Sequence, residues 1–150
     1  MKINPLAIAL AACLSMPIVA FAELGGTVAS VETDRVQMKA TVRVARAANN
    51  FTVHELTLSS GATVREYVAG NGAIFGVAWN GPTAPNLQQI LGQYFSALSD
   101  TTAVKHASHT QMRVEKADLV VHTSGHMRAF AGHAYLTSKL PQGVTAADIQ

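Results

Sequence analysis

The sequence predicts an α+β domain in which an antiparallel sheet packs against an amphipathic helix. Three observations predict this fold. Residues 51–80 hold three apolar-rich runs separated by two turn signals, Ser59-Ser60-Gly61 and Asn71-Gly72, and two strands flanking Asn-Gly are typical of a β-hairpin. Residues 86–98 carry one apolar stripe at helical spacing. Residues 111–137 contain further short strand-like runs. We therefore expect a three-stranded meander at 51–80, C-terminal strands at 111–137, and a helix near 86–98 that packs on them.

The first 22 residues have the pattern of a cleaved signal peptide. Lys2 supplies a positive charge, Ile3–Phe21 is almost wholly apolar, and the segment ends in a small-x-small cleavage pattern at Ala22. We expect cleavage after this alanine and a single exported domain at 23–150, in the periplasm or secreted. The alternative is a lipoprotein, because the sequence LAAC resembles a lipobox in which Cys13 would carry the lipid.

The composition of the mature chain excludes several kinds of partner and site. The formal charge of +2 falls to +1 when Lys2 is removed with the signal peptide. Such a near-neutral chain lacks the basic patch expected for binding to nucleic acid or anionic lipid, and no membrane span is expected in it. Cys13 is the only cysteine, so a disulfide, a cysteine nucleophile and a cysteine metal site are all excluded from the mature chain.

The segment before the meander predicts a helix and an edge strand. Ser30 is followed by Glu32 and Asp34, and acidic residues are favoured in the first turn of a helix by its dipole. We expect a short helix near Val28–Lys39. Residues 41–46 (TVRVAR) alternate between apolar and polar side chains and predict an edge strand.

The segment after the meander predicts the helix near 86–98 and three more strands. Asn86 is a favourable N-cap, and Gln89 three residues later completes a capping-box pattern. A polar loop is expected at 100–109. The remaining expected elements are strands at Gln111–Glu115, Asp118–His122 and His126–Thr137, a turn at Thr123-Ser124-Gly125, and a last helical turn near Thr145–Asp148.

Four segments together resemble a known protein family. They are VHELTLSSGATVREYV, GAIFGVAWNGP, PNLQQILGQYF and GHMRAFAGHAYLTSKLPQGVTAADI, which span most of the mature chain. The resemblance is to small exported proteobacterial proteins grouped as a domain of unknown function, number 2844. It implies a bacterial exported protein. It supplies no activity, cofactor or catalytic residue, so function has to be inferred from the residues themselves.

Strand pairing in the meander predicts a buried histidine–glutamate pair. A three-residue loop at 59–61 sets Glu55 opposite Arg65 and His54 opposite Glu66, whereas a two-residue loop would oppose Glu55 and Glu66, whose like charges repel. The first register is therefore favoured. It places the pair on one face with Leu56, Val64, Val68, Phe75, Val77 and Trp79. His54 and Glu66 are then weak candidates for acid–base catalysis, although a mutually satisfied structural pair is the simpler interpretation.

The C-terminal histidines are weak candidates for metal ligands. Across a Thr123-Ser124-Gly125 turn, His122 and His126 would be direct cross-strand neighbours, close enough to chelate an ion. Because side chains alternate between the two faces of a strand, His133 is expected on the opposite face from His122 and His126. A bulge at Gly132 would bring it to the same face. Imidazole ligands in an exported protein would suit copper or zinc.

No catalytic sequence motif accompanies these candidates. A G-x-S-x-G elbow, a phosphate loop, a dinucleotide fingerprint and an H-E-x-x-H motif are all missing from the sequence. We therefore expect a non-catalytic protein without a cofactor, which binds an envelope protein or a small ligand through a sheet face or the uncharged helix face. The alternatives are a metal or small-ligand binder that uses His122, His126 and His133, and an enzyme built on His54 and Glu66.

Overall fold

The computed structural model describes residues 23–100, 104–108 and 110–150. The signal peptide predicted at residues 1–22, and the alternative lipid attachment at Cys13, lie outside the described residues. Within the described ranges, none of the helices reaches the length and apolarity that crossing a bilayer requires.

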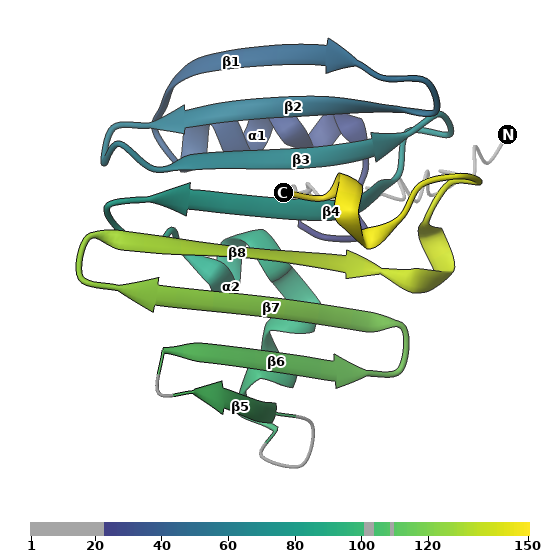
Figure 1. Ribbon diagram of the computed structural model, residues 1–150. Coiled ribbons are helices and arrows are strands. Elements are labelled where there is room, and N and C mark those ends of the chain that lie inside the picture. The colour runs from purple at the N-terminus through teal and green to yellow at the C-terminus, as the bar shows by residue number, and fades with distance from the viewer. Residues whose placement is uncertain (1–22, 101–103, 109) are drawn as a thin grey trace, which may run out of the picture.

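Eight strands form one antiparallel sheet in the order β1-β2-β3-β4-β8-β7-β6-β5 (Figure 1). Two four-stranded meanders therefore meet at the β4–β8 ladder. The predicted α+β fold is confirmed, and the sheet is larger than the meander and C-terminal strands that predicted it. The strands are β1 (Ala40–Ala47), β2 (Phe51–Leu58), β3 (Thr63–Ala69), β4 (Ile74–Gly81), β5 (Val104–Ser108), β6 (Gln111–Lys116), β7 (Leu119–His126) and β8 (Ala129–Leu136).

One face of the sheet, here called the helix face, carries all the longer helical elements. Helix α1 (Val28–Gln37) lies behind β2 and β3, and α2 (Leu87–Leu91) with the 3₁₀ helix η1 (Gly92–Ser99) lies behind the second meander (Figure 1). Apolar side chains from both layers form the main core. Its fully buried members include Val31, Leu56, Val64, Val77, Ile90, Leu91, Val121 and Leu136.

The two helical predictions are confirmed in place and differ in detail. Helix α1 begins after the N-cap Thr27, so Asp34 lies beyond the first turn and is fully buried. At the second helix, the Asn86 Oδ1 atom accepts a hydrogen bond from the Gln89 amide at 3.2 Å, as the capping pattern predicts. The expected single helix to residue 98 is interrupted. Gly92 has a φ of 51°, which lies outside the α-helical region and favours glycine, and the chain continues beyond it as a 3₁₀ helix.

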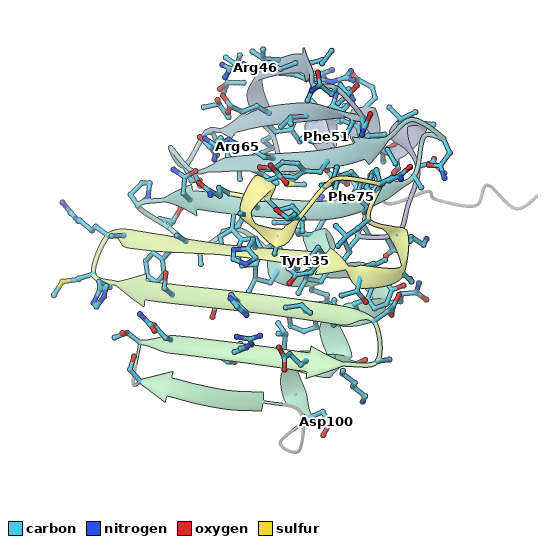
Figure 2. The ribbon with its side chains drawn as sticks, turned by 45° about the vertical axis from the view of Figure 1, so that its right-hand side comes forward. Arg46, Phe51, Arg65, Phe75, Asp100 and Tyr135 are labelled. Atoms are coloured by element: carbon cyan, nitrogen blue, oxygen red, sulfur yellow. The ribbon has the colours of Figure 1, made fainter. Side chains whose placement is uncertain are left out.

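The opposite face is partly covered by a C-terminal segment, residues 137–150. It contains the short helices η2 (Thr137–Lys139) and η3 (Ala146–Asp148) and crosses in front of β4 (Figure 1). Ile149 is fully buried and packs with Tyr67, Phe75 and Ala78. Figure 2 shows Phe51, Phe75 and Tyr135 beside this segment. The Tyr67 hydroxyl anchors its end by donating to the Gln150 carbonyl at 2.8 Å and accepting from the Gln150 amide at 3.0 Å.

The predicted register of the first meander is confirmed for β2 and β3. His54 pairs with Glu66, Glu55 pairs with Arg65, and the Arg65 Nε atom donates to the Glu55 carboxylate at 2.8 Å. The prediction is wrong for Phe75. A register shift between Tyr67 and Val68 makes Phe75 an extra residue in β4, so its side chain lies under the C-terminal segment rather than in the helix-face core.

Two predictions for the second meander are also wrong. Thr123-Ser124-Gly125 is not a turn but part of β7, and the chain reverses instead at Met127 and Arg128, where Arg128 has a φ of 62°. The expected loop at 100–109 contains β5, which pairs with β6 and forms an outer edge of the sheet. Both strands pair with their neighbours in sequence, and this pairing overrides the local turn and loop signals.

Candidate functional site

The predicted His54–Glu66 pair lies on the helix face, beneath α1. His54 is 6% exposed and Glu66 is 1% exposed. Each side chain has a partner outside the pair. The Arg43 guanidinium donates to the His54 Nδ1 atom at 3.1 Å, and the Glu66 carboxyl shares a hydrogen bond with Asp34 of α1. The structure therefore joins three buried polar residues, Asp34, His54 and Glu66, to the exposed Arg43 of β1. These four residues are here called the buried cluster.

The electrostatics of the buried cluster favour a neutral Glu66 side chain. Burial raises the pKa of Glu66 to about 9, helped by the negative charge of Asp34 and the hydrogen bond between the two, and opposed by Arg43. Burial, and then the charge of Arg43, lower the pKa of His54. A neutral carboxyl does not stabilise a protonated imidazole. Glu66 therefore does not raise the pKa of His54, as acid–base catalysis by the pair would require. The cluster is enclosed but not fully satisfied, because the buried Glu66 Oε2 atom has no hydrogen-bond partner among the described residues.

The face opposite the helices is hollowed where the C-terminal segment ends. A groove of ≈ 660 Å³ lies over β8, β7 and β6, and β7, β6 and β5 stand clear of the C-terminal segment in Figure 1. Arg65, Asn80 and Gln150 border it on one side, and Gln111 and Arg113 border it on the other. Its remaining lining includes His122, Ser124, Ala131 and His133.

Cross-strand pairing brings His122 and His133 together in this groove. They are direct partners in the β7–β8 ladder, and their ring centroids are 4.9 Å apart with an interplanar angle of 46°. The His122 Nε2 atom is buried and has no hydrogen-bond partner among the described residues. Burial lowers the pKa of both imidazoles, with a further contribution from Arg113 at His122 and from His122 at His133.

The structure changes the predicted relations among the three C-terminal histidines. His126 and His122 lie on the same strand, so the expected cross-strand contact between them is wrong. His126 pairs with Ala129 at the exposed end of the hairpin. His133 faces His122 without a bulge at Gly132, because the turn lies three to four residues later than expected, at Met127 and Arg128. Within the described part of the chain, no three histidine, cysteine, aspartate or glutamate side chains converge as a metal site.

The two arginines at the groove are each bonded to a carboxylate. The Arg65 guanidinium binds Glu55 and also donates to the Asn80 Oδ1 atom and the Gln150 carbonyl, each at 3.1 Å. The Arg113 Nε atom donates to Glu115 at 2.8 Å. These pairs offset the positive charge of both guanidinium groups, so the groove has little surplus charge.

Sequence reasoning missed Asp34 and Arg43 in the buried cluster and Arg65 and Arg113 at the groove. The first two belong to elements whose docking depends on tertiary packing, which local patterns do not encode. A signal for Arg113 was available. Arg113 lies two positions after Gln111 in β6, so both side chains are on the same face of the strand. Pairing of β6 with β7 then places Arg113 beside His122.

The chain matches the family described as "Protein of unknown function (DUF2844)" over residues 20–149. It belongs to this family. No curated protein and no solved structure matches the chain.

Proposed function

We propose that this chain is an exported, non-catalytic protein that binds a small polar ligand in the groove over β6, β7 and β8. The observation that carries the proposal is the uneven covering of the sheet. The C-terminal segment seals the apolar part of one face, whereas the part beside it is hollow. Guanidinium, imidazole and amide groups line this hollow together with the apolar atoms of Trp79, Met112 and Ala131. Its ≈ 660 Å³ is in the size range of small-molecule sites.

The position of the buried cluster supports a role without catalysis. His54 and Glu66 lie under α1 on the other face of the sheet, and their side chains are almost wholly removed from solvent. A general base has to come within hydrogen-bonding reach of the proton that it removes from a substrate. The groove, in contrast, is open to solvent.

Ligand binding is tested by nuclear magnetic resonance on protein that has been treated with a chelator and screened against small polar compounds. We expect binding compounds to shift the backbone amide signals of Ala131, His122 and Arg113. Ala131→Trp fills the groove floor and should abolish these shifts. Ala129→Trp is the matched control, because it lies at the hairpin end outside the groove. Shifts confined to α1 or α2, or retained in Ala131→Trp, would contradict the proposal.

Export is tested by cell fractionation and intact-mass measurement. The sequence pattern at residues 1–22 supports a mature protein that begins at Glu23 and is found in the periplasm or the medium. The structure is compatible with a start at this point, because Leu24 is fully buried and its amide donates to the Ile90 carbonyl at 3.0 Å. A mass that corresponds to a lipidated chain beginning at Cys13 would support the lipoprotein alternative instead.

A further inference from the structure

The spacing of His122 and His133 fits joint coordination of one metal ion. Zinc and copper bind imidazole nitrogen at about 2.0–2.1 Å, and two rings bound to one ion at about 90–109° would have their centres about 4.5–5.2 Å apart. The observed separation of the ring centroids is 4.9 Å. The two strands already hold the rings at this distance, so coordination needs side-chain rotation and no change of register.

The state of the two rings also suits metal binding. The buried His122 Nε2 atom has no hydrogen-bond partner among the described residues, and an unpaired buried nitrogen is costly to a fold. A coordinated ion would supply the missing interaction.

The surrounding charges do not oppose a divalent cation strongly. The guanidinium nearest His122 is that of Arg113, which is bonded to Glu115, and Arg65 at the far side of the groove is bonded to Glu55. These contacts also leave neither arginine as a free anion-binding group. A phosphate or carboxylate ligand would have to compete with a carboxylate already in place, whereas the unpartnered His122 nitrogen is available.

We infer that His122 and His133 form a two-histidine site for Cu²⁺ or Zn²⁺ on the floor of the groove. The chemistry is that of ions that prefer imidazole, in contrast to Mg²⁺ and Ca²⁺, which prefer oxygen ligands. With two protein ligands, the ion keeps open positions for water or for a donor atom of the bound ligand. The inference deepens the proposed function and rests on the same groove.

The test is calorimetric titration of chelator-treated protein with Cu²⁺, Zn²⁺ and Mg²⁺. We expect one Cu²⁺ or Zn²⁺ per chain and no binding of Mg²⁺. His122→Gln and His133→Gln should each weaken binding at least about tenfold, since even the loss of an outer partner of a metal ligand has an effect of that size. His126→Gln is the matched control. It removes an exposed histidine from the same hairpin and should leave the affinity unchanged.

A second measurement does not depend on the folding of variants. In the unaltered protein, paramagnetic Cu²⁺ should first broaden the signals of residues that flank positions 122 and 133, before those of the hairpin end at Met127. Binding that is equal in His122→Gln, His133→Gln and the unaltered protein would overturn the inference. So would broadening that begins at the hairpin end. Because the small-molecule screen uses metal-free protein and the Ala131→Trp variant, failure of the metal site and failure of the groove as a ligand site give different results.

Discussion

Two histidine-containing clusters lie on opposite faces of the same sheet and differ in almost every physical property. In the buried cluster, His54 is covered by α1 and accepts a hydrogen bond from Arg43, and the adjacent Glu66 is bonded to Asp34. In the groove, His122 and His133 contact each other, and the His122 Nε2 atom is unpartnered among the described groups. Both are cross-strand pairs in the structure, but the sequence predicted only the first of them and set His122 opposite His126 instead of His133.

The difference shows that partners and access decide which pair is available for binding. A buried polar group that is bonded to its neighbours and closed off from solvent contributes to the fold, and its removal leaves those neighbours unsatisfied. A polar group that faces a groove with an unused nitrogen has little structural role and can accept a ligand. The predictions below test this contrast, beginning with the largest expected effect.

Gly132→Ala should be the most destabilising change, because Gly132 belongs to β8, the strand that separates the groove from the core on the helix face. A Cβ at this position would overlap the indole ring of Trp79, which is 3% exposed on the helix face. Overpacking of this kind costs about 3 kcal/mol in the free energy of unfolding. Gly70→Ala is the matched control, since a Cβ there meets no atom within 4 Å. Chemical denaturation of both variants would measure the effect, and equal stabilities would mean that the core beneath the groove is loosely packed.

His54→Ala and His133→Ala should separate the two clusters directly. Removal of the buried His54 leaves a cavity and the Arg43 guanidinium without its imidazole acceptor, so we expect a loss of about 2 kcal/mol. Removal of the partly exposed His133 should cost less than about 0.5 kcal/mol. Urea unfolding followed by circular dichroism would measure both. A larger loss at His133 than at His54 would reverse the comparison.

Glu66→Gln should stabilise the protein above neutral pH, by an amount that grows as the pH rises. The folded-state pKa of about 9 lies above the ordinary value of 4.5, so the folded chain retains a proton that the unfolded chain releases. The free energy of unfolding should therefore fall as pH rises between these two values, by at most about 1.4 kcal/mol per pH unit.

Glutamine keeps the neutral shape of Glu66 and should remove this slope. Unfolding measured from pH 5 to pH 9 would test it, with Glu115→Gln, an exposed carboxylate near the groove, as the control that keeps the slope. A destabilised Glu66→Gln variant with an unchanged slope would mean that Glu66 is ionised in the folded protein.

Much of the first meander could be predicted because its determinants are local. The three-residue loop Ser59-Ser60-Gly61 and the avoidance of a Glu55–Glu66 contact together predicted the register of β2 on β3. The inserted residue Phe75 could not be predicted in this way, because the burial of its ring depends on the C-terminal segment. That segment comes more than sixty positions later in the chain.

The site was less predictable than the fold. The sequence identified His122 and His133 as candidates but placed the hairpin turn at Thr123-Ser124-Gly125, since glycine and serine are common in turns. The paired strands override this local preference, and β7 continues to His126. A shift of the turn by a few residues changes which histidines are opposite each other, so the error in one turn became an error in the predicted site.

The β4–β8 ladder also has a consequence for the order in which the protein folds. All the other ladders in the sheet join strands that are consecutive in the chain, so the contacts inside each meander are short-range. The β4–β8 ladder joins positions as distant as Gly76 and Tyr135, and its formation closes a long loop whose entropy is lost before the new contacts repay it. We expect the two meanders to form early and this ladder to set the folding rate. The groove, whose lining comes from both meanders, then exists only after that last step.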